Sequence, residues 1–191
     1  MKIVILPGVG FREKDNSYDF FINNLQKKIK HEINYHNWIH HCGFKDHDNN
    51  HISSNKMLKS KRVRGLVSEV ILDFQSVLIK SEKIEIPDAD VYITHSAGSI
   101  LALNERPEKH LILMGSPAGL ISEEFNVNEK TMINIIHKND PIAYPLDGIE
   151  NFYFDSHVAE LSRYCPIGAH SKYWKSNKVI NKIAEKFNQW F

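Results

Sequence analysis

The chain of 191 residues is 42% hydrophobic, which is enough for one substantial core, so a single domain over residues 1–191 is predicted. Its 24 basic and 23 acidic residues nearly cancel, which argues against nucleic acid or an acidic membrane surface as a partner. Cys42 and Cys165 are too few for a disulfide framework and lack zinc-type spacing, so a reducing, cytoplasmic location is expected.

Short apolar runs alternate with helical patterns along the whole chain, which is typical of βαβ units around a parallel sheet. In chain order the sequence predicts a strand at 3–6, a helix at 15–30, a strand at 33–39, a polar loop at 40–55, a helix at 57–79, a strand at 91–94, a helix from Ser96, strands at 110–114, 131–136 and 151–154, and a helix at 177–190. The first apolar run is too short for a signal peptide or a membrane span, so no stable membrane insertion is expected.

Residues 91–103 form the most informative segment, because a buried strand runs directly into Ser96 and then into a helix. Small residues, Ala97 and Gly98, lie where the turn is tightest. Such a turn pushes the serine hydroxyl out at the carboxyl end of the sheet, where it can act as a nucleophile. The alternative is that Ser96 simply caps the helix, since serine is a favoured N-cap.

A serine hydroxyl is a poor nucleophile at neutral pH and needs a base, which an acid usually orients. Asp140 follows the predicted strand 131–136 and is held by the proline after it. Two histidines come later, His157 after the last predicted strand and His170 in a glycine-bearing loop before the terminal helix. The chain order is therefore serine, acid, histidine, and by position either histidine could reach Ser96.

The turn at Ser96, the loop 139–144 and the segment 170–174 resemble those of lipase-type and esterase-type α/β-hydrolases. The resemblance implies a three-layer α/β/α sandwich with a mostly parallel sheet, in a minimal form without a separate cap domain. It also favours His170 over His157, because the catalytic histidine of such proteins is commonly followed by Tyr and Trp and then by a final helix. Thr94 departs from the family, where a glycine usually stands two residues before the nucleophile, as Gly98 does two residues after it.

The resemblance further implies an oxyanion hole built from two backbone N–H groups. Ala97 supplies one donor, at the start of a helix whose dipole favours an anion. The second is assigned to Val9 in the loop after the first strand, with Gly8 and Gly10 as alternatives. Pro7 stands in this loop where the family often has histidine.

The sequence thus predicts a serine hydrolase that cleaves a carboxylic ester or thioester of a small molecule or lipid through an acyl-enzyme, without metal or cofactor. Acyl transfer with the same triad, and a non-catalytic binding protein on the same scaffold, are the alternatives. Substrate identity and oligomeric state are left open, as is whether residues 40–55 or 115–129 form a lid.

Two other kinds of site are not favoured by the sequence. Gly8 and Gly10 lack the third glycine and the later acidic residue of a dinucleotide fingerprint. Histidines are dense between residues 31 and 51, but without the spacing of a metal site. They are His31, His36, His40, His41, His47 and His51. His95 is adjacent to the candidate nucleophile, but its side chain is expected to point away from that of Ser96 and to pack or hydrogen-bond.

Overall fold

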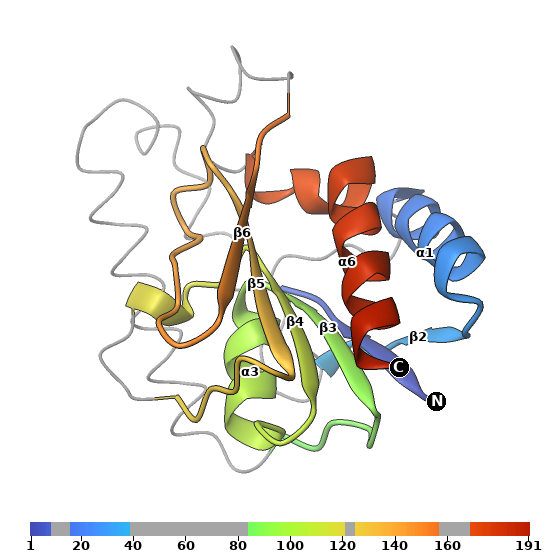
Figure 1. Ribbon diagram of the computed structural model, residues 1–191, viewed down its shortest axis with the longest axis horizontal. Helices are drawn as coiled ribbons and strands as arrows, with labels where there is room; N and C mark the ends of the chain where they lie inside the picture. The colour runs from blue at the N-terminus through green and yellow to red at the C-terminus, as the bar shows by residue number, and fades with distance from the viewer. Residues whose placement is uncertain (9–15, 39–83, 121–124, 157–168) are drawn as a thin grey trace, which may run out of the picture.

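The computed structural model describes residues 1–8, 16–38, 84–120, 125–156 and 169–191 (Figure 1). Six strands form one sheet in the order β2-β1-β3-β4-β5-β6, and every pairing is parallel. The strands are β1 Ile3–Leu6, β2 Ile33–Tyr35, β3 Val91–His95, β4 His110–Met114, β5 Met132–His137 and β6 Glu150–Phe154. The prediction of a mostly parallel sheet is confirmed.

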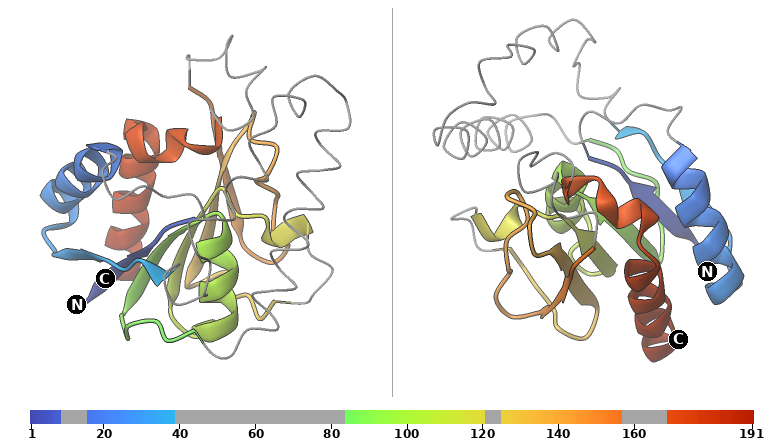
Figure 2. Two further views of the ribbon diagram at one scale, coloured as in Figure 1. Left: turned by 180° about the vertical axis from the view of Figure 1, so that it is seen from behind. Right: turned by 90° about the horizontal axis from the view of Figure 1, so that it is seen from above.

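Helices cover both faces of this sheet. Helices α1 (Asn16–Ile29) and α6 (Asn177–Trp190) lie side by side on one face, and α3 (Ala97–Glu105) lies on the other (Figures 1 and 2). Two short 3-10 helices, η4 (Ala118–Leu120) and η5 (Lys172–Lys175), follow β4 and precede α6. The predicted three-layer α/β/α fold class is therefore confirmed by the arrangement of the described elements.

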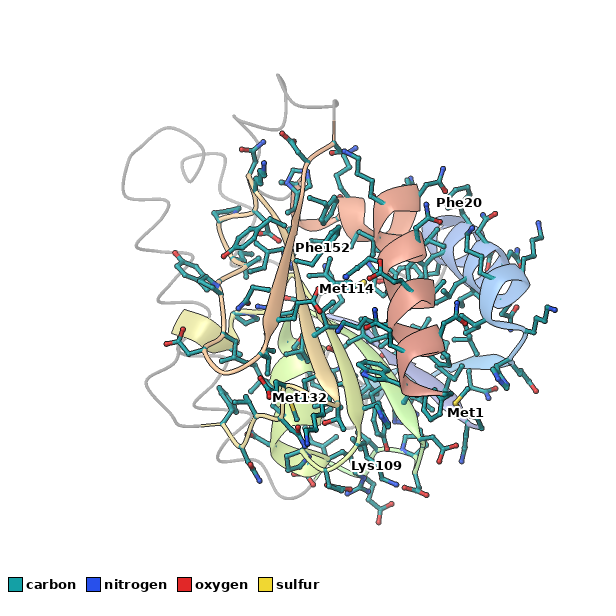
Figure 3. The ribbon with its side chains drawn as sticks, viewed as in Figure 1. Met1, Phe20, Lys109, Met114, Met132 and Phe152 are labelled. Carbon is teal, nitrogen blue, oxygen red and sulfur yellow. The ribbon has the colours of Figure 1, made fainter. Side chains whose placement is uncertain are left out.

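The period of two in each strand divides the apolar side chains between two cores. Ile5 and Ile93 face α1 and α6, whereas Leu6 and Tyr92 face α3. Met114 at the end of β4 lies in the interior on the side of α6, and Phe20 lies on the outer surface of α1 (Figure 3). Strands buried on both faces read as continuous apolar runs, which is why they were predictable from the sequence.

The predicted strand 33–39 is too long, because β2 ends at Tyr35. The N–H of His36 still donates to the carbonyl of Ile5, at 3.0 Å, but the neighbouring strand then reaches Pro7, which has no N–H to continue the ladder. The boundaries of the other strands either match the prediction or differ from it by one residue. Strand β5, for instance, begins at Met132 because Thr131 is still held in a turn by Asn128.

Several predictions fall outside the described residues, among them the loop 40–55, the helix 57–79 and most of the histidine-rich stretch. Within the described ranges, the structure has no helix with the length and apolar composition that a membrane span requires. The same ranges hold no group of three or more His, Cys, Asp or Glu side chains arranged for a metal ion.

A parallel sheet brings the carboxyl ends of all its strands to one edge, where ligand sites of open α/β folds form. Here that edge carries Pro7 after β1, Ser96 after β3, Gly115 after β4 and Asp140 after β5. The candidate residues from distant parts of the sequence are thereby collected at one side of the molecule.

Candidate active site

Ser96 occupies a strained turn between β3 and α3. Its backbone has φ 53° and ψ −127°, a region that residues other than glycine rarely adopt. The turn is held by the Ser96 N–H, which donates to the carbonyl of Met114 at 2.9 Å, and by the Ser96 carbonyl, which accepts from the Ser99 N–H at 2.9 Å. The side chain makes no capping hydrogen bond to the helix, so Ser96 is not the ordinary N-cap that composition alone allowed.

Two glycines permit the close packing around this turn. A Cβ on Gly98 would lie 2.5 Å from the Leu6 carbonyl oxygen, and one on Gly8 would lie 2.6 Å from the Ser96 Cβ. Both distances are shorter than real Cβ contacts allow, so side chains at these positions would push the loop after β1 away from the serine. The backbone of Gly8 therefore runs directly against the candidate nucleophile.

Thr94, the departure from the family pattern, is accommodated by a hydrogen-bonded pair. Its hydroxyl donates to the Ile112 carbonyl at 3.2 Å, and Thr94 Oγ1 lies 2.9 Å from Ser99 Oγ. Because the single Thr94 hydroxyl proton goes to Ile112, Ser99 is the donor of the second bond. Both hydroxyls are completely buried and both are paired, so the β-branched side chain here leaves no polar group unsatisfied.

Asp140 lies in the turn after β5 and is buried with three donors around its carboxylate. Oδ1 accepts the Ile142 N–H at 2.9 Å, and Oδ2 accepts His170 Nδ1–H at 2.8 Å and the Tyr173 hydroxyl at 2.7 Å. Burial acts to raise the pKa of Asp140, but the hydrogen bonds from His170, Ile142 and Tyr173 outweigh it and lower the pKa below its ordinary value. The carboxylate is therefore ionised at neutral pH and able to orient an imidazole.

His170 is the ring that this carboxylate holds. A carboxylate only accepts hydrogen bonds, so the contact fixes the proton of a neutral His170 on Nδ1 and leaves Nε2 as the lone-pair nitrogen. The prediction that His170 lies in a loop is wrong, because Ala169 and His170 have helical backbone and η5 follows directly. Buried Tyr173 and Trp174 anchor this segment in the core beneath α1 and α6.

Gly115 lies at the junction of these groups. It has φ +57°, and a Cβ there would lie 3.1 Å from His170 Cε1 and 3.2 Å from Asp140 Oδ2. It also follows Met114, whose carbonyl accepts from Ser96. The turn after β4 thus touches the serine on one side and the His170–Asp140 pair on the other. Within the described residues no hydrogen bond joins Ser96 Oγ to the His170 ring, a contact that is often loose in unliganded sites.

The candidate oxyanion donors are only partly described. Ala97 is the first residue of α3, and the first N–H groups of a helix have no partner within it, so they point outward. Val9 and Gly10 lie outside the described residues, as does the alternative base His157. Pro7, directly after β1, is held in place, because Trp38 Nε1–H donates to its carbonyl at 2.7 Å from a completely buried indole.

Sequence reasoning did not find the contacts that two residues make with the pair. Tyr173 is three residues after His170, a spacing that puts both on one face of a helical turn, so a helical rather than a loop interpretation would have found it. The prediction that His95 packs or hydrogen-bonds is confirmed, since its Nε2 lies 2.7 Å from the His170 carbonyl oxygen. No local pattern identifies that partner, which is 75 residues away in the sequence.

Comparison with known proteins gives little beyond the geometry. No protein-family model matches the sequence, and no curated protein matches it. A search of solved structures finds a protein from Xanthomonas campestris pv. campestris, provisionally described as a hydrolase of the alpha/beta superfamily. That likeness covers 91% of this chain and 98% of the other, with 13% identity and a TM-score of 0.40, and it carries no argument about activity.

Proposed function

We propose that this protein is a serine hydrolase that cleaves a carboxylic ester or thioester of a small molecule or lipid. The observation that carries the proposal is the hydrogen bond between His170 and the buried Asp140 carboxylate, at the same sheet edge as a serine on a strained turn. Strained backbone persists where the surrounding structure enforces it, commonly at functional sites. A serine whose hydroxyl neither caps its helix nor lies in the core is free for chemistry.

In the proposed reaction, Ser96 Oγ attacks the carbonyl carbon while His170 Nε2 accepts the hydroxyl proton. His170 then gives that proton to the leaving alcohol or thiol as the carbon–oxygen or carbon–sulfur bond breaks, which leaves an acyl-enzyme. Water, deprotonated by the same Nε2, releases the acid and restores the serine. Asp140 holds the imidazole through Nδ1–H and stabilises its protonated form.

Negative charge develops on the carbonyl oxygen during each attack, and backbone N–H groups aimed at it lower the barrier. The Ala97 N–H at the start of α3 is one proposed donor, and its position beside Ser96 supports that role. The second donor is proposed at Val9. The close approach of Gly8 to the Ser96 Cβ supports a donor from this loop.

Acyl transfer to an acceptor other than water uses the same first half-reaction, and product analysis with candidate alcohols or thiols distinguishes it from hydrolysis. A binding protein without turnover is the other candidate. The observation in its favour is that no hydrogen bond joins Ser96 Oγ to the His170 ring in the described part of the chain.

The test is hydrolysis of p-nitrophenyl acetate by four proteins: wild type, Ser96→Ala, His170→Gln and His157→Gln. We expect turnover by wild type and by His157→Gln, and a loss of kcat of about 10³-fold or more in the other two variants. Circular dichroism checks that each variant is folded. Equal turnover by Ser96→Ala and wild type would refute the nucleophile, and loss in His157→Gln alone would transfer the base to that histidine.

A further inference from the structure

His95 is the last residue of β3 and directly precedes Ser96, yet its ring reaches the segment of the candidate base. Its Nε2 lies 2.7 Å from the backbone carbonyl oxygen of His170, and the two rings are 4.5 Å apart at 39°. A carbonyl oxygen only accepts, so Nε2 carries the proton and donates. The bond therefore joins the strand of the nucleophile to the main chain of the base.

The surroundings of His95 keep the ring in this state. The side chain is buried against Tyr173 and Trp174, with ring centroids 5.5 Å and 5.4 Å away. Burial, reinforced by the nearby His170, lowers the pKa of His95 to about 3. A neutral ring with its proton on Nε2 is thus a constant donor across the range in which an esterase works.

We propose that His95 is a positioning residue, which sets where the imidazole of His170 stands relative to the hydroxyl of Ser96. The inference rests on the proposed function. Two linkages carry it: one peptide bond joins His95 to Ser96, and one hydrogen bond joins His95 to His170. Asp140 fixes the direction of the His170 ring, and His95 fixes the backbone from which that ring projects.

A histidine that served only to fill the core would affect folding without a specific effect on the chemical step. Loss of the donor, by contrast, releases the His170 main chain without changing an exposed side chain. A displacement of a catalytic group by about 1 Å can lower the rate about 10²-fold. The expected signature is therefore a lower kcat with an unchanged KM.

The experiment compares two variants of similar length that differ in the donor, His95→Gln and His95→Met. The Gln amide N–H can replace Nε2–H, whereas the Met thioether cannot donate. With p-nitrophenyl acetate, we expect His95→Gln to stay within a few-fold of wild type and His95→Met to lose about 10- to 100-fold in kcat at constant KM. Equal kcat in both variants, whether both high or both low, would overturn the proposal.

A measurement on the wild-type protein covers the case in which His95→Met does not fold. Imidazole ¹⁵N NMR should show His95 neutral, with its proton on Nε2, and without titration between pH 8 and about pH 5. A His95 that titrates in this range, or carries its proton on Nδ1, would overturn the proposal. A wild type that turns over no ester would count against the proposed function instead, because the NMR result does not depend on activity.

Discussion

Tyr173 gives the acid of the proposed triad a second donor at the same oxygen that holds His170. Its hydroxyl donates to Asp140 Oδ2 and accepts the His137 N–H at 2.9 Å. Burial and the charge of Asp140 raise the pKa of Tyr173 well above 10, so it remains a donor at every working pH. The hydroxyl draws negative charge from the carboxylate that would otherwise stabilise a protonated His170.

Replacement of Tyr173 by Phe removes this donor and keeps the ring in the core. The Asp140 carboxylate and the His137 N–H each then lose a partner in the core, so we expect the free energy of unfolding to fall by about 1–3 kcal/mol. Tyr153→Phe is the control, because Tyr153 is exposed on β6. Urea unfolding measures the cost, and an unfolding free energy equal to that of wild type in Tyr173→Phe would show that the hydroxyl does not help to hold the pair.

Among single residues, the sequence was sufficient to identify candidates for the nucleophile, the acid and the base, because each of these groups requires the others. Ser96 stands out because a strand, a serine and small residues follow one another, and Asp140 and His170 come in the order that such a nucleophile requires. His95 carries no such local demand, and Tyr173 is signalled only when the segment after His170 is interpreted as helical. Their roles arise from contacts across the sheet edge, which exist only once the chain is folded.

At the level of elements, β3 and α3 are joined on their buried side by the Thr94–Ser99 hydroxyl pair. Thr94→Val leaves the Ser99 hydroxyl without its acceptor in the core, at a cost of about 1–2 kcal/mol in the free energy of unfolding. Adding Ser99→Ala removes the unpaired hydroxyl. The double variant should therefore lose less free energy of unfolding than the two single variants lose in sum. Urea unfolding of the four proteins measures this coupling, and additive costs would show that the two hydroxyls do not interact.

Most elements could be predicted because both faces of the sheet are buried and the apolar runs are continuous. A predicted boundary is wrong where a neighbouring strand determines where the element ends. Strand β2 ends early because Pro7, which has no N–H, ends the partner strand β1. That cause is not visible in residues 33–39 themselves, so the sequence of that segment alone was insufficient.

For the whole molecule, buried neutral histidines make stability depend on pH. The folded-state pKa of His95, about 3, lies below the ordinary value of 6.5. Between these values the unfolded chain binds a proton at this site and the folded chain does not, so stability falls as pH falls. Burial also lowers the pKa of His110 and His137, which act in the same direction.

We expect the free energy of unfolding to decrease below pH 6.5 by up to about 1.4 kcal/mol per pH unit from His95 alone. The stability that Asp140 contributes is fully present above about pH 4 and is lost only at lower pH, since its folded-state pKa lies below 3.8. His95→Gln should flatten the dependence between pH 6 and about pH 4. Denaturant unfolding at several pH values gives the slopes, and identical slopes for wild type and His95→Gln would contradict this assignment.

The proposed activation of Ser96 by His170 and Asp140 is measured most directly by reaction of the folded protein with a fluorophosphonate, followed by mass spectrometry of the modified peptide. We expect one adduct per chain, located on Ser96, absent in Ser96→Ala and formed much more slowly in His170→Gln. An unmodified wild type, or labelling that persists unchanged in Ser96→Ala, would contradict this proposal.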